Sequence, residues 1–159
     1  MGRELYKLNV RWLKQADLLD VVEIERETFA DDWSASEIKL VLRQKCTVAM
    51  VACYGELNLG YMIYELHRDR VSLIRLAVHP GFLRVGVGTR LVKTLLGSDK
   101  ARRVEIAVCE SNFVAQVFFR SLGFEVTQIY RDYYEGEDAY LFRVGESVEK
   151  VLVNRLAVE

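Results

Sequence analysis

Two hydrophobic patterns alternate in the first third of the chain. Residues 5–13 alternate apolar and polar side chains and predict a strand. Apolar residues then recur every three or four positions over 18–29, which predicts a helix with Asp17 as its N-cap. Ser34 and Glu37 form a capping box, since each side chain can accept from the other's backbone N–H. A second short helix is therefore expected to end near residue 43.

The middle of the chain predicts strands on both sides of one helix. Residues 47–53 and 58–66 are rich in β-forming side chains around a glycine turn, which predicts an antiparallel hairpin. Residues 71–78 predict a third strand, 87–97 a helix and 103–109 a further strand. Because strand, loop, helix and strand form a crossover unit, strands 71–78 and 103–109 are predicted to be parallel.

The last third predicts one more helix and a strand pair. Residues 112–122 have helical spacing, and Gly123 is placed to end that helix in a left-handed conformation. Residues 124–130 and 139–144 predict two strands, and the tail 145–159 has the apolar spacing of an amphipathic helix.

Length and composition favour one soluble domain. A chain of 159 residues without repeats or linkers predicts a single domain over 1–159, with a core at about 5–144 and a C-terminal extension over 145–159. The net charge is −1 with 22 scattered Lys and Arg, which argues against a nucleic-acid partner. No apolar run approaches the roughly 20 residues that span a bilayer, so we expect no membrane partner and a cytoplasmic location.

The cysteines do not predict a metal or disulfide site. Cys46, Cys53 and Cys109 are odd in number, widely spaced and set in apolar runs. We expect buried, reduced thiols and no metal.

The stretch GFLRVGVGT over residues 81–89 is a candidate anion loop, and two common phosphate motifs do not fit it. A Walker loop starting at Gly81 requires lysine and a hydroxyl residue after Gly86, where Val87 and Gly88 stand. A dinucleotide fingerprint requires a third glycine where Leu91 stands.

What remains is a loop at the positive end of a helix. Gly86 and Gly88 let backbone amides approach an anion closely, with Arg84 and Arg90 nearby. A pyrophosphate fits this description, and a tight turn without a ligand is the alternative.

The motifs around this loop resemble the GNAT superfamily of acyl-CoA-dependent N-acyltransferases. LAVHP precedes the loop at 76–80, and a segment that begins SN and ends SLGF follows at 111–124. The resemblance covers roughly residues 5–144. Residues 29–34 and 131–139 are similar in particular to the branch of bacterial ribosomal-protein-alanine N-acetyltransferases.

The resemblance implies an α+β (α/β) fold and acetyl-CoA as cosubstrate. The fold is a mixed, mostly antiparallel central sheet with a parallel pair splayed at the coenzyme site and helices on its faces. The loop is implied to hold the coenzyme pyrophosphate, and strand 76–78 to pair with the pantetheine arm. The implied coenzyme-binding residues are Leu76, Ala77, Val78, Arg84, Val85, Gly86, Val87, Gly88, Thr89, Asn112 and Phe119.

Two of these assignments carry a reservation in the sequence itself. Leu83 stands where the family has Gln or Arg, which we expect to weaken the site without removing it, because backbone amides bind most of the phosphate. Asn112 has a helix cap as its alternative role.

The usual catalytic side chains of the branch are missing. Ala107 stands at the position of the glutamate base, and Phe119 at that of the tyrosine that protonates the leaving thiolate. Glu105 lies on the same strand face as Ala107, roughly 6 to 7 Å away, and is the candidate base, with a surface or edge carboxylate as the alternative. Tyr134 is the candidate source of a hydroxyl, with an aromatic wall as the alternative.

The missing base bears on the acceptor. An α-amine with a pKa near 8 is about a tenth neutral at pH 7, whereas a lysine amine is neutral in well under one molecule in a thousand. Together with this argument, the resemblance implies an acetyl-CoA-dependent N-acetyltransferase of protein N-terminal α-amines, with Phe29, Trp33 and Tyr133 at the acceptor site. A small-amine acetyltransferase and a catalytically weak acyl-CoA-binding module are the alternatives, and monomer and homodimer both stay open.

Overall fold

The structure, a computed structural model, describes residues 7–98 and 103–145. These residues gather into two compact units. Unit 1 extends to Leu66 and includes Ile74–Ser98, and unit 2 consists of His67–Leu73 and the described residues from 103 onward. Seven strands of the described chain form one sheet in the order β1-β2-β3-β4-β5-β7-β6, and β4 (Arg70–Val78) contributes to both units.

The elements of unit 1 follow the predicted order. They are β1 (Leu8–Trp12), η2 (Gln15–Asp17), α1 (Leu18–Thr28), α2 (Ala35–Leu42), β2 (Thr47–Tyr54), β3 (Leu57–Leu66), the second part of β4, η3 (Pro80–Phe82) and α3 (Val87–Ser98). β1 pairs with β2 and β2 with β3, both antiparallel. The predicted hairpin and the capping box at the start of α2 are confirmed, because Ser34 and Glu37 exchange hydrogen bonds of 2.6 and 3.2 Å.

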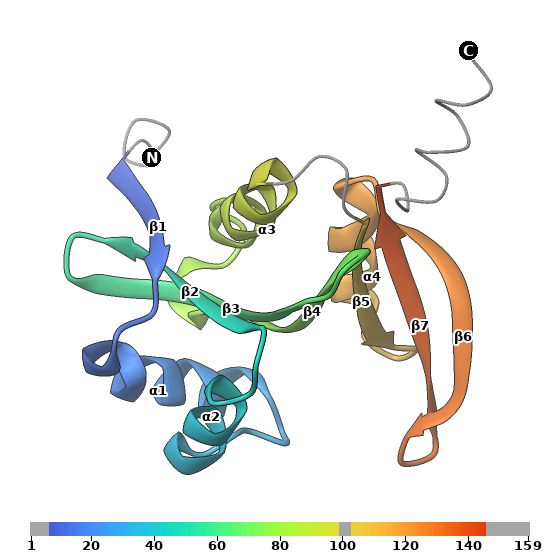
Figure 1. Cartoon of the computed structure of the whole chain (residues 1–159), viewed down its shortest axis with the longest axis horizontal. Helices are drawn as coiled ribbons and strands as arrows, with labels where there is room; N and C mark the ends of the chain where they lie inside the picture. The colour runs from blue at the N-terminus through green and yellow to red at the C-terminus, as the bar shows by residue number, and fades with distance from the viewer. Residues whose placement is uncertain (1–6, 99–102, 146–159) are drawn as a thin grey trace. The chain divides into compact units, whose positions relative to one another are not determined.

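The core of unit 1 lies between α1, α2 and the strands. α1 and α2 cover one face of β2 and β3, and α3 lies on the other face (Figure 1). Helical spacing places the apolar stripe of α1 toward the sheet, where it meets alternate residues of two strands. The buried cluster consists of Leu18, Val21, Ile24, Ile38, Ala49, Val51, Tyr61, Ile63 and Ala77.

Unit 2 is built on the parallel pair that the sequence predicted. The start of β4 runs parallel to β5 (Arg103–Cys109), with Ser72 opposite Glu105. α4 (Phe113–Ser121) leads into β6 (Glu125–Tyr134) and β7 (Glu137–Val144), which pair antiparallel with each other, and β7 also pairs antiparallel with β5. The predicted fold class, a mostly antiparallel sheet with one parallel pair and flanking helices, is thereby confirmed.

Asp17 does not cap α1 as predicted. Its carboxylate accepts hydrogen bonds of 2.7 and 2.9 Å from Arg11 and one of 2.7 Å from the N–H of Lys14, and no cap hydrogen bond to α1 is made. The reason is that η2 runs directly into α1, so the backbone of Asp17 is already helical, and the bidentate arginine is the stronger partner.

The second strand pair is longer than predicted. Tyr133 and Tyr134 were expected in a loop after residue 130, but β6 continues to Tyr134 across a shift in register. Asp132 takes a left-handed φ of 52° there, and its N–H donates to the carboxylate of Asp138 at 2.8 Å. This contact spans both strands, which local β-propensity does not reveal.

Two smaller expectations have different outcomes. Cys53 is buried, but Cys46 is exposed, so the prediction of a buried thiol is wrong there; Cys46 lies in the turn after α2 with a left-handed φ of 66°. The amphipathic helix predicted over 145–159 falls, apart from Gly145, outside the described residues.

Candidate functional site

In unit 1, the predicted coenzyme loop connects the end of β4 to α3. Ala77 is buried, and the N–H of His79 donates to the carbonyl of Leu59 on β3 at 2.7 Å, which fixes the strand end. The His79 Nδ1 atom then accepts from the N–H of Gly81 at 3.0 Å and shapes η3. This role of His79 was missed, since a histidine beside a proline carries no distinctive pattern.

The chain turns twice through the left-handed region before α3 begins. Arg84 has a φ of 61° and Gly86 a φ of 94°, and the Gly86 carbonyl accepts the helical hydrogen bond from Arg90. The first N–H groups of a helix have no partner within it and carry partial positive charge. The exposed loop therefore presents backbone donors and two arginines where the sequence predicted a pyrophosphate, so these residues fit that group.

Gly60 lets β3, β4 and α3 approach closely in unit 1. A Cβ atom at position 60 would stand 2.9 Å from the carbonyl oxygen of Ala77 and 3.1 Å from Cγ1 of Val87. Real Cβ atoms essentially never show a contact as short as the first, and the second is tighter than most, so glycine relieves the packing at this point. Ala77 and Val87 are both predicted coenzyme residues, which makes Gly60 a support of the same loop.

The predicted acceptor residues Phe29 and Trp33 lie in the segment between α1 and α2, and both rings contact one arginine. The guanidinium carbon of Arg75 is 4.0 Å from the ring centroid of Phe29 and 4.3 Å from that of Trp33. Its Nε and Nη2 donate to Glu25 Oε1 at 2.8 and 2.6 Å. Burial raises the pKa of Glu25 above its usual value, against the opposing effect of Arg75.

Sequence reasoning missed both Glu25 and Arg75. The available signal was a charge in an apolar pattern: Glu25 follows Val21 by four positions on the buried stripe of α1, and Arg75 interrupts the apolar strand β4. A charge in such a position requires a partner, although the sequence does not say which one.

In unit 2, the candidate base Glu105 is the centre of an ion-pair network. Its Oε1 accepts from Arg70 Nε and its Oε2 from Arg143 Nε, each at 2.9 Å, while Arg103 Nε lies 3.9 Å away. The residue is 9% exposed, so it is neither a surface nor a free edge carboxylate. The transfer of a proton at Glu105 stays a prediction.

The remaining predicted residues of α4 have structural partners within unit 2. The Oδ1 of Asn112 accepts from the N–H of Ala115 at 3.1 Å and caps the helix. Phe119 is 3% exposed, with its ring centroid 5.2 Å from Phe124 and 6.4 Å from Phe142. Coenzyme contacts by Asn112 and Phe119 stay predictions.

Tyr133 and Tyr134 lie at the end of β6, on a hairpin held by Asp138. Their ring centroids are 5.1 Å apart, and Tyr133 is the more exposed of the two. The hydrogen bond from the Asp132 N–H, followed by the one from Arg131, holds the pKa of Asp138 below its usual value. Asp138 therefore fastens the hairpin that carries the two tyrosines.

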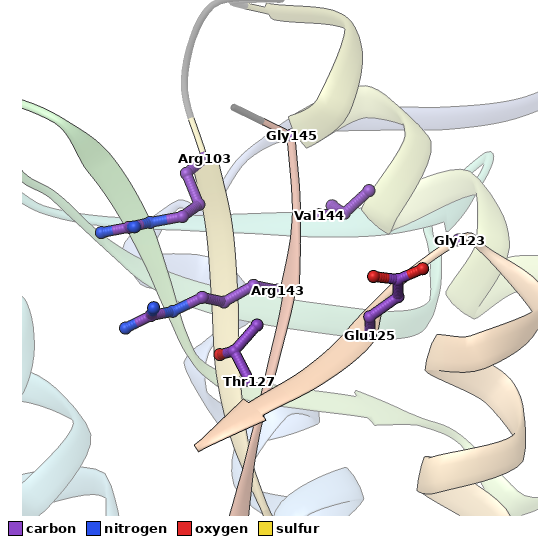
Figure 2. Close-up of a pocket in the computed structure, with 7 residues that line it drawn as sticks. All are labelled: Arg103, Gly123, Glu125, Thr127, Arg143, Val144 and Gly145. Atoms are coloured by element: carbon purple, nitrogen blue, oxygen red, sulfur yellow. The ribbon is translucent and has the colours of Figure 1, made fainter. Parts of the chain in front are cut away.

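A separate cavity of about 250 Å³ lies in unit 2. Figure 2 shows Arg103 and Arg143 pointing to the same side of β5 and β7, and Glu125 lies on the neighbouring strand β6. The remaining lining residues are Gly123, Thr127, Val144 and Gly145. All the predicted site residues are in the described part of the chain, and none of them lines this cavity.

Two further observations concern the described residues as a whole. Within 7–98 and 103–145, no three side chains of His, Cys, Asp or Glu gather closely enough to hold a metal ion. The helices of this part of the chain are too short or too polar to cross a membrane.

The chain belongs to the Acetyltransferase (GNAT) family, whose profile matches residues 3–124. It is an N-acetyltransferase by this membership and by its relatives. An uncharacterised N-acetyltransferase of Methanocaldococcus jannaschii is 30% identical over 83% of this chain and 88% of its own. The ribosomal protein bS18-alanine N-acetyltransferase of Escherichia coli is 27% identical over 79% of this chain and 86% of its own.

Solved structures show the same fold. The crystal structure of the ribosomal-protein-S18-alanine N-acetyltransferase from Escherichia coli has a TM-score of 0.77 at 24% identity, covering 86% of this chain and 92% of that one. Arabidopsis thaliana NAA60, in complex with a bisubstrate analogue, has a TM-score of 0.74 at 17% identity, covering 86% and 97%. The expected resemblance to the bS18-alanine N-acetyltransferases is confirmed.

Proposed function

We propose that this chain transfers the acetyl group of acetyl-CoA to the α-amine of a protein N-terminus. The observation that carries the proposal is the construction of unit 1, in which β4 bears the coenzyme strand and loop as well as the arginine that holds Phe29 and Trp33. The relatives named as N-acetyltransferases of a ribosomal-protein alanine support the same acceptor class.

The coenzyme is held by the main chain rather than by one side chain. The amides at the start of α3 and the charges of Arg84 and Arg90 favour a pyrophosphate, and the chain of Leu76–Val78 offers the pantetheine amides a strand edge. Acetyl-CoA carries the acetyl group as a thioester. Leu83, which stands where the family has Gln or Arg, is 57% exposed. Its side chain therefore does not fill the loop.

The acceptor is chosen by its basicity and by an aromatic wall. Phe29 and Trp33 are half-buried around Arg75 and form the proposed wall. The neighbouring Asp31 is 81% exposed at its side chain and attracts a cationic chain end. An α-amine is neutral often enough at pH 7 to attack without a strong base, whereas lysine carries a handicap of about 3 kcal/mol. The oxygens of Glu105 accept from two arginines, which favours an acceptor that needs little help from a base.

The reaction forms a carbon–nitrogen bond and breaks the carbon–sulfur bond. The amine nitrogen adds to the acetyl carbonyl carbon and loses a proton to water or to a side chain, and the thiol leaves as thiolate and is protonated. A thiol pKa near 8.5 makes this departure feasible without the tyrosine that Phe119 replaces. The N–H of Val78 is proposed to donate to the carbonyl oxygen as it becomes negative. The hydroxyl role of Tyr134 stays a prediction.

The experiment is an acetylation panel with the purified chain and acetyl-CoA. Peptides with a free N-terminus, the same peptides with a blocked N-terminus and one lysine, and polyamines are compared by thiol release, and mass spectrometry locates the acetyl group. We expect turnover with free N-termini and at least a hundredfold less with blocked peptides. Turnover confined to small amines would contradict the proposal.

A weakly catalytic acyl-CoA-binding module is the second candidate, and Ala107 and Phe119 are the observations that favour it. Calorimetry with coenzyme A separates the two, because a binding module gives tight association without turnover on any amine of the panel.

A further inference from the structure

Arg75 is the most heavily engaged side chain around the proposed acceptor segment. Its side chain is 13% exposed and extends from β4 within unit 1. Besides the two hydrogen bonds to Glu25, its Nη2 donates to the main-chain carbonyl of Asp31 at 3.0 Å. One guanidinium thus contacts the end of α1 and the middle of the segment that joins α1 to α2.

Glu25 is the fixed end of this arrangement. It is fully buried, and its Oε1 accepts from the N–H of Trp33 at 3.2 Å as well as from Arg75. Its Oε2 is buried without a hydrogen-bond partner among the described residues. A buried carboxylate without Arg75 beside it is costly, so the pair must be formed whenever Glu25 is charged.

The stacking of Phe29 and Trp33 requires the geometry of arginine. A planar guanidinium can place a ring on each face while its edge donates in plane to a carboxylate and a carbonyl. Lysine retains the charge but has neither the flat faces nor the fork of donors. The contacts at 4.0 and 4.3 Å therefore depend on the shape of the side chain as well as on its charge.

We propose that Arg75 is a positioning residue that sets the acceptor wall of the enzyme. Its guanidinium contacts both Phe29 and Trp33 and donates to Glu25, so the wall keeps its place beside Arg75. Arg75 immediately precedes Leu76 on β4, so the rigid segment that is proposed to bind the coenzyme also holds the wall. The inference rests on the proposed function and adds a determinant of acceptor affinity that acts through two aromatic residues.

The test compares Arg75→Lys with Arg11→Lys in the full chain. Arg11 is a matched control, because it also makes a bidentate pair within unit 1, with Asp17 at 2.7 and 2.9 Å. A Glu25→Gln/Arg75→Gln double variant provides a neutral pair in case Arg75→Lys folds poorly. We expect both Arg75 variants to raise the acceptor KM about tenfold and to leave the acetyl-CoA KM within twofold, and Arg11→Lys to change neither.

A second readout does not depend on turnover. Trp33 becomes the sole tryptophan in a Trp12→Phe background, since the chain has two, and Trp12 is 63% exposed and readily replaced. We expect acrylamide quenching of Trp33 to rise at least twofold in both Arg75 variants and to stay unchanged in Arg11→Lys. Rising quenching supports the ordering of the wall, and the KM shift supports its effect on the acceptor.

The outcomes separate this inference from the proposed function. If the parent enzyme acetylates no amine, the proposed function fails while Trp33 quenching still decides whether Arg75 orders the wall. If both Arg75 variants keep the parent acceptor KM and the parent quenching, the positioning role is overturned. A third outcome is a lower kcat in the Arg75 variants with the acceptor KM, the acetyl-CoA KM and the quenching unchanged. It would show only a loss of active protein, so it also overturns the positioning role.

Discussion

Replacing Gly60 by alanine tests the packing that supports the coenzyme loop. The new Cβ would lie 2.9 Å from the carbonyl oxygen of Ala77 and 3.1 Å from Cγ1 of Val87. An ordinary contact needs a few tenths of an ångström more in each case, and the first of these atoms is backbone. The strand end and the start of α3 must therefore shift apart.

The expected magnitude follows from opposing effects. Overpacking of a buried site costs about 1–3 kcal/mol, and the reduced freedom of the unfolded chain returns about 0.4–1 kcal/mol. A net loss of about 1–2 kcal/mol corresponds to a Tm lower by about 2–8 °C for a chain of this size. Because Ala77 and Val87 are proposed coenzyme residues, we also expect the Kd for coenzyme A to rise about tenfold, equivalent to about 1.4 kcal/mol.

Gly97→Ala, on α3, is the matched control for Gly60→Ala on β3. A Cβ at Gly97 meets no atom within 4 Å, so alanine there adds helix propensity without a clash. We expect its Tm to rise by about 1–3 °C with coenzyme affinity unchanged. Thermal melts by circular dichroism and calorimetry with coenzyme A measure both variants. A Gly60→Ala protein with the parent Tm and the parent Kd would refute the packing argument.

Three further predictions concern carboxylates and a helix cap. Glu105→Gln should lower the free energy of unfolding by about 3 kcal/mol, because Arg70 and Arg143 lose a common buried partner. Urea unfolding measures this loss. An unchanged stability together with a loss of kcat would instead identify Glu105 as a base. The hydrogen bond from Arg11 holds the pKa of Asp17 well below its ordinary value, so the stabilisation that Asp17 supplies is full above that ordinary value and is lost as the pH falls through the lowered pKa. Asp17→Asn should therefore flatten the acid limb of urea-unfolding stability plotted against pH. Asn112→Ala should cost about 1 kcal/mol as a lost cap, whereas Asn112→Ser should keep the Tm and still weaken coenzyme A binding several-fold; parent affinity in calorimetry of the serine variant would restrict Asn112 to capping.

Local pattern was sufficient for most of the elements. The strand over 103–109 and the helix that starts at Val87 match their predictions, because apolar periodicity and glycine punctuation report burial within a few residues. The capping box at Ser34 is likewise local, since both partners lie within three positions.

The failures involve partners that are chosen across the fold. Asp17 was expected to cap a helix on local grounds, but Arg11 on the neighbouring strand offers it a bidentate pair. Tyr134 was expected in a loop, but Asp138 on the facing strand holds the register shift that extends β6. In both cases a side chain on another element outweighs the preference of the local sequence.

The candidate site divides in the same way. The conformation of the loop over 81–89 could be predicted, because glycine spacing and the start of a helix are both visible in the sequence, while coenzyme binding by this loop stays a proposal. The contacts behind the proposed acceptor wall could not be predicted from the sequence, because Arg75 and Glu25 are 50 positions apart. A charge within an apolar pattern signals a buried partner, and only the fold identifies it.

Asp17 and Glu25 are both buried carboxylates of unit 1, and each is paired with an arginine. Comparing them shows why the pair of Glu25 and Arg75 is better suited to a site than to a scaffold. Asp17 accepts on both oxygens, from Arg11, Lys14 and Asn58, and these hydrogen bonds outweigh burial, so its pKa is lowered. Glu25 accepts only on Oε1, burial outweighs Arg75, and its pKa is raised. A raised pKa means that the contribution of Glu25 to stability is full below the value of the unfolded chain and is lost as the pH rises through the folded value. The raised pKa of Glu25 therefore means that its pair with Arg75 stabilises the fold less than a fully satisfied pair would. Such a pair is expected where positioning of an acceptor, as proposed, rather than stability decides which residues are kept.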